Sequence, residues 1–357
     1  MGNPAIPILA VYTAVISLLL IGILRRSPRQ QKRATSDPIS IIVAARNAES
    51  SIGRCLEALT AQTYPRDLVE ILVVDDDSTD RTLEIARRLA IETPRIRVYR
   101  NRHRFASSKK AALKTAVEQA RGTYLLFTDA DCTPPPTWAQ GMIRSFQDDT
   151  GVVAGFAPQS VEKPSCWSRF LFTDSLASAL VAAAGIGWGR GITCTGRNLG
   201  LRARALEAIG GYDALPDSVS GDDDFLLQTI SRHPDWRPGY CFDHETHVFA
   251  SGPAGWAPFV RQKRRHISAG LFYRPGQKLG YALFHFCNAA LWFSPLLFTA
   301  ALPLISKLLF DYTVLRLFVR KLNTRMTLYD FVQWEILFPL VHLVSSPALF
   351  AARIRWS

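Results

Sequence analysis

The sequence TYLLFTDAD occupies residues 123–131 and marks the end of a strand at the centre of the predicted fold. Its first six residues form an apolar run with strand character, and the loop-forming sequence CTPPP follows the two aspartates. Asp129 and Asp131 therefore stand at the carboxyl end of a buried strand. Two carboxylates at this spacing form a hard oxygen site, which suits Mg²⁺ or Mn²⁺ that still carries water and a bound diphosphate.

Three further apolar runs of strand length precede this segment, with amphipathic helical patterns between them. The four predicted buried strands are residues 39–45, 69–74, 96–99 and 124–128. Short connections between alternating strands and helices predict a doubly wound α/β sheet, in which functional groups gather where the strands end. Arg46-Asn47 and Asp75-Asp76 follow two of these strands, so we expect them on the same side of the sheet as Asp129 and Asp131.

Composition divides the chain into four regions: residues 1–25, 26–37, 38–275 and 279–352. The first contains an uncharged apolar segment, residues 5–24, that is long enough to span a bilayer. No small-residue cleavage pattern follows it, so we expect a retained anchor and not a removed signal peptide. The second region is a basic linker. Because basic flanks stay in the cytoplasm, the third region, the predicted α/β domain, is expected at the cytoplasmic face of the cell membrane.

The fourth region is expected to cross the membrane two or three times. Residues 279–306 and 328–350 are each long enough for one crossing. Two crossings would leave the basic residues near position 320 outside, whereas a hairpin near Pro303 gives three crossings and returns them to the cytoplasm. We favour three, and an interfacial helix over residues 308–320 is the alternative. Asp311 is expected to pair with Lys307, four residues earlier on a helix.

Charge and cysteine content exclude several classes of protein. The net charge is +12, and the basic residues gather beside apolar segments, which favours an anionic membrane surface over nucleic acid as a partner. The six cysteines lack paired spacing, so the sequence predicts neither a disulfide framework nor a zinc site. It predicts that the protein lies in a reducing compartment. We expect all six to be small buried residues. The sequence leaves the oligomeric state open.

Seven short motifs resemble those of family 2 glycosyltransferases and occur in the same order. They are residues 42–49, 73–80, 128–131, 196–199, 210–213, 221–223 and 262–266. The resemblance covers about residues 38–270. It implies a GT-A fold, a nucleotide-diphospho-sugar donor, a divalent metal and inversion of the anomeric centre.

The resemblance also implies which residues bind the donor and the metal. The expected donor-binding residues are Ala45, Arg46, Asn47, Glu49, Asp75, Asp76, Asp129, Gly196 and Asn198. Asp131 would hold the metal, with Asp129 on the metal or its water, or on the ribose. Either Asp75 or Asp76 would accept from the uracil N–H. Asp77 departs from the family, which often has glycine or asparagine there, and Arg46 is a candidate to offset its charge.

The acidic cluster Asp222-Asp223-Asp224 would supply the general base. By position in the family pattern Asp223 takes the acceptor proton, and Asp222, which replaces the more common glutamate, touches the acceptor or orients Asp223. Repulsion within the cluster should raise at least one carboxyl pKa. The alternative is an acidic helix N-terminus stabilised by the helix dipole.

The basic run Gln262-Lys263-Arg264-Arg265-His266 resembles the family's QxxRW motif, with histidine where tryptophan is usual. Arg265 would contact the departing diphosphate, and Gln262 and His266 would lie on the acceptor side. Because the tryptophan stacks on the acceptor sugar, His266 weakens any inference about processivity. The alternative is a membrane-surface helix that binds anionic lipid.

These patterns predict a membrane-anchored, inverting, metal-dependent glycosyltransferase. It would move a hexose or N-acetylhexosamine from a UDP-sugar, with a GDP-sugar as second choice, to a hydroxyl of a lipid or lipid-linked acceptor. The layout of its apolar segments is similar to that of ceramide glucosyltransferases. A processive polysaccharide synthase is the first alternative. A catalytically inactive scaffold or binding subunit is an alternative of another class.

Overall fold

A seven-stranded mixed sheet forms the centre of the fold in the computed structural model, which describes residues 4–25, 37–161, 163–297 and 301–345. Its strand order is β3-β2-β1-β4-β8-β6-β9, and β8 is antiparallel to both of its neighbours. The strands are β1 (Ile39–Ala45), β2 (Val69–Asp75), β3 (Ile96–Arg100), β4 (Tyr124–Asp129), β6 (Thr150–Gly155), β8 (Leu199–Arg202) and β9 (Arg237–Cys241). The prediction of an α/β sheet is confirmed, and the antiparallel β8 makes the sheet a mixed one.

Helices cover both faces of this sheet, and a small second sheet flanks it. The helices are α2 (Ile52–Thr60), α3 (Thr82–Glu92), α4 (Ser108–Gln119), α5 (Trp138–Arg144), α7 (Ala203–Ala208) and α8 (Asp222–Ile230). The second sheet pairs β5 (Cys132–Thr133), β10 (Phe249–Ser251) and β7 (Gln159–Ser160). Short 3₁₀ turns lie at Arg66–Leu68, Gly196–Asn198, Gly211–Ala214, His244–Thr246 and Gly270–Phe272.

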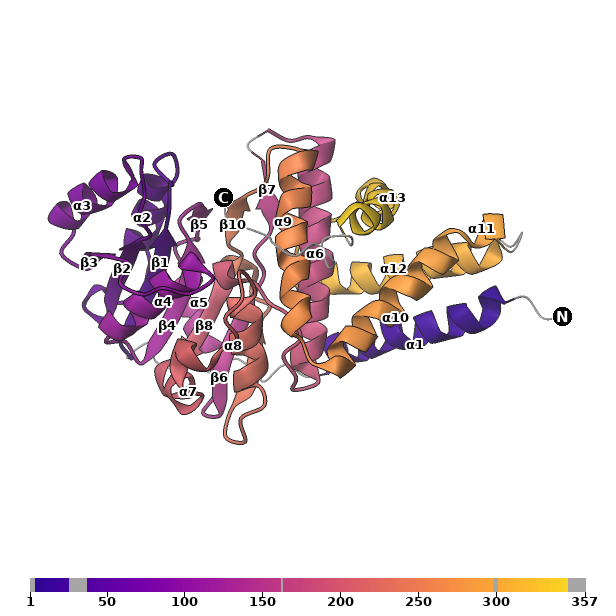
Figure 1. Cartoon of the computed structure of the whole chain (residues 1–357), viewed down its shortest axis with the longest axis horizontal. Coiled ribbons are helices and arrows are strands. Elements are labelled where there is room, and N and C mark those ends of the chain that lie inside the picture. Colours follow the sequence, from indigo (N-terminus) through magenta and orange to yellow (C-terminus); the bar gives the residue numbers. More distant parts are fainter. Residues whose placement is uncertain (1–3, 26–36, 162, 298–300, 346–357) are drawn as a thin grey trace.

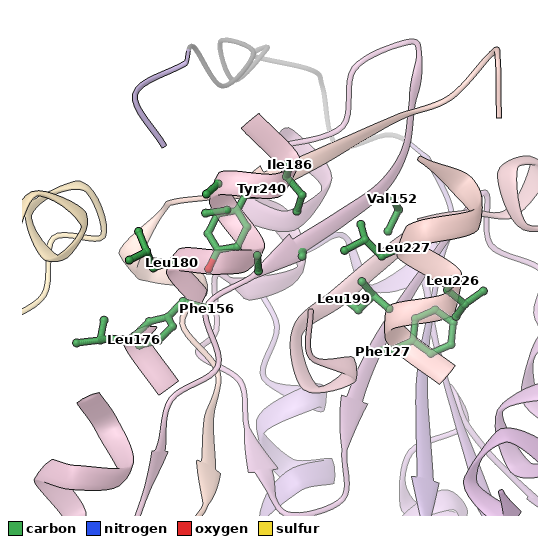
Figure 2. Close-up of a cluster of buried hydrophobic side chains, with 14 of the residues drawn as sticks. Phe127, Val152, Phe156, Leu176, Leu180, Ile186, Leu199, Leu226, Leu227 and Tyr240 are labelled. Carbon is green, nitrogen blue, oxygen red and sulfur yellow. The ribbon is translucent and has the colours of Figure 1, made fainter. Parts of the chain in front are cut away.

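The alternation of side chains along β1 explains why this strand is apolar at almost every position. Ile39, Ile41 and Val43 pack into one hydrophobic cluster with α2, whereas Ile42 points into the cluster on the opposite face. Both faces are therefore buried, as expected for a parallel strand at the centre of a sheet. Figure 2 shows part of the second cluster, in which Leu226 and Leu227 of α8 lie near Phe127 and Leu199 of the sheet.

A long helix, α6 (Cys166–Gly187), was not predicted from the sequence. Figure 2 places its residues Leu176, Leu180 and Ile186 near Tyr240 of β9, within the same hydrophobic cluster. The hydroxyl of Ser165 caps the helix by accepting from the backbone N–H of Ser168 at 3.1 Å. This helix forms the boundary between the sheet and the remaining helices.

The remaining long helices form the second half of the molecule. They are α1 (Ala5–Leu24), α9 (Trp256–Ala269), α10 (Pro275–Trp292), α12 (Leu302–Lys321) and α13 (Leu328–Ser345), with the short α11 (Ser294–Leu297) after α10. In Figure 1, α1, α10 and α12 run together away from the sheet, and each contacts the other two. By contrast, α6 and α9 stand across that direction, and α13 is seen nearly end-on. We call α1, α10 and α12 the three-helix bundle.

Close backbone contact fixes the bundle to α6. A Cβ on Gly22 would lie 2.4 Å from the carbonyl oxygen of Ala184, and a Cβ on Gly187 would overlap the carbonyl of Gly22. Only glycine allows so close a crossing of two helices. Nearby, the indole of Trp188 donates to the carbonyl of Leu18 at 2.9 Å. The end of α1 nearest the sheet is therefore locked against α6.

By length and composition, two of the described helices could cross a membrane: α1 and α6. The α6 window is 61% buried, between the sheet and the other helices. The predicted crossings at 279–306 and 328–350 fall on α10 to α13, and Pro303 stands in the first turn of α12. The proposed interfacial segment 308–320 is part of that same helix. Residues 298–300 and 346–352, and nearly all of the predicted linker, lie outside the described residues.

Buried charged residues join the helices of this second half. Lys307 of α12 pairs with Asp311 at 3.1 Å, as predicted, and also with Glu335 of α13. The Tyr12 hydroxyl of α1 donates to Asp311 at 2.7 Å, and the Trp292 indole of α10 donates to Glu335 at 3.3 Å. Each of these charges has an opposite partner, which offsets the cost of burying it.

The cysteines are mostly, but not all, buried. Cys55, Cys132, Cys241 and Cys287 are buried, and Cys194 is half-buried. Cys166, at the start of α6, is exposed, so the prediction that all six are buried is wrong there.

Candidate active site

A cavity of about 1430 Å³ opens where β4 and β6 end, between the sheet and helices α8 and α9. Eight residues predicted to act on the donor, the acceptor or the metal line it: Asp129, Asp131, Gly196, Asp222, Asp223, Gln262, Arg265 and His266. They come from segments up to 137 positions apart in the chain, since 266 − 129 = 137. The fold therefore brings together residues that the sequence only suggested were related.

The predicted donor residues at the ends of β1 and β2 lie outside the cavity lining. They connect the loop after β1 to the loop after β2. Asn47 Oδ1 accepts from the backbone N–H of Thr79 at 2.9 Å, and Glu49 accepts from the backbone N–H of Arg81 at 3.1 Å. These contacts hold the two loops side by side. Ala45 and Asp76 extend the pairing, because the N–H of Asp76 donates to the carbonyl of Ala45 at 2.9 Å.

The three aspartates after β2 have different surroundings. Asp76 accepts from the Asn101 amide at 2.8 Å and lies 3.7 Å from Arg46. Asp75 is 3% exposed, and its Oδ1 has no hydrogen-bond partner among the described residues. Asp77 has a φ of +54°, a backbone conformation that glycine, asparagine and aspartate adopt most readily. This conformation explains why aspartate can replace the family's glycine or asparagine at position 77.

Asn198 has a structural position that differs from the predicted one. Its side chain is fully buried. Its Oδ1 accepts from the Trp138 indole at 2.9 Å, and its amide donates to the carbonyls of Phe156 and Thr246, both at 2.9 Å. These bonds use the hydrogen-bonding groups of the side chain within the protein, so the described contacts of Asn198 are structural ones and not those predicted with the donor.

A lysine that the sequence did not single out meets the strand-end carboxylates. Lys109, in the first turn of α4, pairs with Asp129 Oδ1 at 2.5 Å. Burial alone would raise the pKa of Asp129, but Lys109 holds that pKa below its ordinary value. The pKa of Asp131 is raised, first by burial and then by the charge of Asp129. Asp131 therefore has a carboxylate whose ionised form a nearby cation would stabilise.

This donor set fits the expected metal. Magnesium and manganese bind through one or two carboxylates together with water and the phosphates of a substrate. Asp129 and Asp131 supply two such carboxylates at the cavity wall. The described residues contain no group of three or more His, Cys, Asp or Glu side chains that could hold a metal by themselves. Further ligands would have to come from the bound substrate and water.

The acidic cluster stands at the N-terminus of α8 with a different partner for each carboxylate. Asp223 accepts from the backbone N–H of Gly196 at 2.7 Å, and Asp222 accepts from the Ser107 hydroxyl at 3.0 Å. Asp224 accepts from the backbone N–H of Cys194 at 2.8 Å and from the Tyr273 hydroxyl. Burial and then the charge of Asp223 raise the pKa of both Asp222 and Asp224 to about 7. The predicted mutual repulsion is confirmed.

Gly196 marks the point where the base cluster approaches the strand-end carboxylates. A Cβ built on it would lie 3.6 Å from Asp223 Oδ2 and 3.8 Å from Lys109 Nζ. Lys109 in turn contacts Asp129. A bound group at this corner of the cavity could therefore be reached by Asp223, Lys109 and Asp129 together.

All five residues of the basic run on α9 line the cavity, but its cations have different partners. Lys263 pairs with the buried Asp174 of α6 at 2.6 Å, and Arg264 donates to the carbonyl of Val344 on α13 at 3.1 Å. Arg265 and His266 line the cavity. Desolvation within the cavity, followed by the charges of Arg265 and Lys263, lowers the pKa of His266 below its usual range, although part of the side chain is exposed to solvent. A membrane-surface role for the whole run is not favoured, because only Arg264 of its three cations is exposed.

Comparison with known proteins identifies the class. Residues 40–209 match the model of glycosyl transferase family 2. Relatives include glycosyltransferase AglE of Haloferax volcanii, 37% identical over 114 residues, and beta-monoglucosyldiacylglycerol synthase of Synechocystis, 26% identical over 230 residues. These matches cover 32% and 60% of this chain, and 36% and 47% of the relatives. The chain thus spans less than half the length of either relative.

A solved structure shares the fold over nearly the whole chain. The mannosyltransferase PcManGT from Pyrobaculum calidifontis, in complex with GDP-Man and Mn²⁺, superposes with a TM-score of 0.64 at 20% identity. The superposition covers 98% of this chain and 99% of that one. Residues 40–209 thus match a family 2 glycosyltransferase domain, and nearly the whole chain has the same GT-A fold as that solved structure.

The raised pKa of Asp222 predicts a pH-dependent stability. The pKa of Asp222 is about 7 in the folded protein and has the ordinary value of 3.8 in the unfolded protein. Below pH 4 the carboxyl is protonated in both states and does not lower the stability of the fold. Stability is then lost progressively as the pH rises from about 4 to about 7, by at most about 4 kcal/mol, and the loss is complete above the folded pKa. We expect Asp222→Asn to raise the melting temperature relative to the wild type increasingly between pH 5 and 8, measured in detergent.

The matched control is Asp235→Asn, since the Asp235 side chain is 78% exposed. Its melting temperature should follow that of the wild type at each pH. A gain from Asp222→Asn that is equal at pH 5 and pH 8 would contradict the assignment.

Proposed function

We propose that the protein transfers a hexose or N-acetylhexosamine, with inversion, from a UDP-sugar to a hydroxyl of a lipid or lipid-linked acceptor. The observation that carries the proposal is a single cavity. It is lined by the strand-end carboxylates, the acidic cluster of α8 and Arg265, and it continues to helices α10 and α13. A donor site and a route to the bilayer therefore share one space.

The proposed chemistry uses three groups of side chains. Asp223 accepts the proton of the acceptor hydroxyl, whose oxygen attacks the anomeric carbon opposite the departing diphosphate. Attack from the opposite face gives inversion. Asp129 and Asp131 would hold Mn²⁺ or Mg²⁺, which when bound neutralises charge on the diphosphate. Lys109 and Arg265 place two further cations beside that group, where negative charge grows as the bond breaks.

The nucleoside is proposed to lie over the ends of β1 and β2. Asp75 is a better candidate than Asp76 to accept from the uracil N–H. Its buried Oδ1 has no partner among the described residues, whereas Asp76 already accepts from Asn101. Arg46, Asn47 and Glu49 would hold the surrounding loops in place. The solved mannosyltransferase of the same fold contains GDP-Man and Mn²⁺, which keeps a GDP-sugar as the second choice of donor.

A lipid acceptor is supported by a relative and by the surface of the bundle. The Synechocystis relative is named as a synthase of a glucosylated diacylglycerol. Large apolar side chains are exposed along α1, α10 and α12, among them Ile6 (62%), Leu279 (69%), Phe286 (66%) and Leu309 (64%). Apolar patches of this kind mark a surface that another phase or molecule covers.

We propose that α1, α10 and α12 span the cell membrane and that the sheet lies on its cytoplasmic side. At the end of the bundle nearest the sheet, Arg25 lies 4.6 Å from the Trp188 ring centroid and Lys321 bonds to the carbonyl of Ile23. Cations and tryptophan are typical of the cytoplasmic membrane interface. This proposal has three crossings in all, two of them in the tail. The sequence analysis favoured three crossings in the tail and gave two as the other choice.

Helix α13 fits the membrane surface better than a crossing. It lies across the bundle direction in Figure 1, and its exposed apolar residues, Leu328, Val332, Ile336, Leu340 and Leu343, recur every three or four positions on one side. Phe331, Trp334 and Glu335 are buried on the other side. One apolar face on a helix that runs across the spans is typical of an interfacial helix.

Product analysis tests the proposed function against its alternatives. Purified protein in detergent is incubated with Mn²⁺, a labelled UDP-sugar and dioleoylglycerol, and the products are separated by size. One added sugar on the lipid supports the proposal, and a ladder of products supports a processive synthase. Release of neither UDP nor labelled product with any UDP- or GDP-sugar would favour the inactive scaffold.

A further inference from the structure

The cavity is larger than a nucleotide sugar requires, and its far part lies beyond Arg265 and His266. Ligand pockets for small molecules commonly have volumes of about 300–1000 Å³, whereas this cavity has about 1430 Å³. The far part is lined by Asp174 and Ser178 of α6, Lys263 of α9, Tyr281 and His285 of α10, and His342 of α13. We call these six residues the bundle-side compartment.

Two histidines from different helices meet in the wall of this compartment. The ring centroids of His285 and His342 are 4.2 Å apart, and Phe338 packs against both rings. Two imidazolium charges at this distance would repel strongly, so the pair carries at most one proton beyond the neutral form. Neutral imidazoles offer both a donor and an acceptor to a bound hydroxyl.

The charges of the compartment balance one another. Lys263 and Asp174 pair at 2.6 Å, and the Lys263 side chain is 17% exposed and that of Asp174 9%. The cations Arg261, Arg264 and Lys278 also border the cavity, but they are exposed at its rim. An anionic head group inside the compartment would therefore lack an unpaired lysine or arginine, whereas an uncharged head would find hydrogen-bonding groups.

The compartment adjoins the exposed apolar surface. On α10, Leu283 and Phe286 flank His285 in sequence and are 38% and 66% exposed. On α13, Leu340 and Leu343 flank His342 and are 47% and 70% exposed. A molecule with its head in the compartment could lay its hydrocarbon chains along these two helices.

We infer that the bundle-side compartment binds the uncharged, hydroxyl-bearing head of the acceptor lipid, and that His285 and His342 hydrogen-bond its hydroxyl groups. This inference rests on the proposed function and narrows the acceptor to a neutral lipid such as a diacylglycerol or a neutral glycolipid. The head then lies on the route toward Asp223, past Gln262 and His266. The chains remain in the membrane.

The test separates acceptor binding from donor turnover. His285→Phe and His342→Phe keep an aromatic ring of similar size but remove the hydrogen-bonding nitrogens. With UDP-glucose, Mn²⁺ and dioleoylglycerol in mixed micelles, each variant should raise the KM for dioleoylglycerol about tenfold, the loss of about one hydrogen bond. Its kcat, and its release of UDP from UDP-glucose without acceptor, should stay within about twofold of wild type.

Two further variants control for misfolding. His342→Gln restores a hydrogen-bonding group and should recover most of the acceptor KM. His244→Phe makes the same change at a side chain that is 54% exposed and outside the cavity lining, and it should match the wild type. If only the variants that misfold lose acceptor affinity, the histidines have a structural role and the inference fails.

Other outcomes distinguish this inference from the proposed function. An unchanged KM for dioleoylglycerol in both phenylalanine variants would overturn the inference while leaving the transferase in place. Preference of the wild type for a polyprenyl phosphate over dioleoylglycerol would overturn the neutral head group. No release of UDP or GDP from any nucleotide sugar by the wild type would instead refute the proposed function.

Discussion

Replacing Asp223 by asparagine is expected to lower kcat by about 10²- to 10⁴-fold, because the amide cannot accept the proton of the acceptor hydroxyl. The substitution keeps the size of the side chain, and its oxygen can still accept from the backbone N–H of Gly196, which lies 2.7 Å from Asp223. The cavity should therefore keep its shape. Binding of UDP, measured by calorimetry with Mn²⁺ present, should remain within about threefold of wild type.

The control for this prediction is Asp67→Asn, at an exposed position of the turn before β2. Its turnover should equal that of the wild type. Asp223 would belong to the donor site, and not to the base, if its substitution abolished UDP binding together with transfer. Full activity of the variant would exclude both roles.

Replacing Asp131 by alanine is expected to abolish metal-dependent turnover and to remove the effect of Mn²⁺ on nucleotide binding. Burial and then the charge of Asp129 raise the pKa of Asp131, so a nearby cation would stabilise its ionised form. Without that carboxylate the cation loses a ligand, and the diphosphate loses a stabilisation of several kcal/mol, at least about a thousandfold in rate.

Metal binding can be measured independently of activity. Titration of Mn²⁺ by electron paramagnetic resonance, with UDP present, should show one bound ion in the wild type and greatly weakened binding in Asp131→Ala. Addition of EDTA to the wild type should reproduce the loss of turnover. Undiminished turnover in EDTA would mean that Lys109 and Arg265 suffice as cations and that the carboxylates have another role.

The sequence predicted those parts of the fold in which local pattern and tertiary structure agree. The strand before Asp129 is buried on both faces, so its apolar run was visible without the structure. Helix α6 was missed because it is buried against the sheet on one side and against α1 and α13 on others. A helix that is apolar nearly all round, rich in alanine and serine, shows no clear amphipathic period.

The same distinction separates the site residues that were predicted from those that were not. Asp129, Asp131 and Asp223 belong to motifs that can be read along the chain, and all three line the cavity. Lys109 belongs to no such motif. Its contact with Asp129 depends on where α4 begins relative to β4, which the sequence does not show. Asn198 shows the opposite case, since it stands inside a motif and yet bonds only to Trp138 and backbone carbonyls in its surroundings.

Charges in the tail make its helices look less apolar in the sequence than they are in the fold. Lys307, Asp311 and Glu335 each lower the apolarity of their own helix, but they neutralise one another across α12 and α13. Hydropathy along one segment cannot include a partner on another helix. The direction of α13 likewise depends on its packing against α6 and α9. The sequence of α13 alone does not determine this packing.

The glycine crossing of α1 and α6 has a consequence for how such an enzyme can be engineered. Gly22 and Gly187 leave no space for a side chain, so, on the proposed membrane placement, the cavity would stand at one fixed distance from the lipid head groups. A foreign transmembrane segment fused in place of α1 would still anchor the protein. Without the glycine contact between α1 and α6, however, the distance from the cavity to the membrane would vary. Membrane anchoring and the distance of the cavity from the membrane are thus separate properties of α1, and only the second depends on the two glycines.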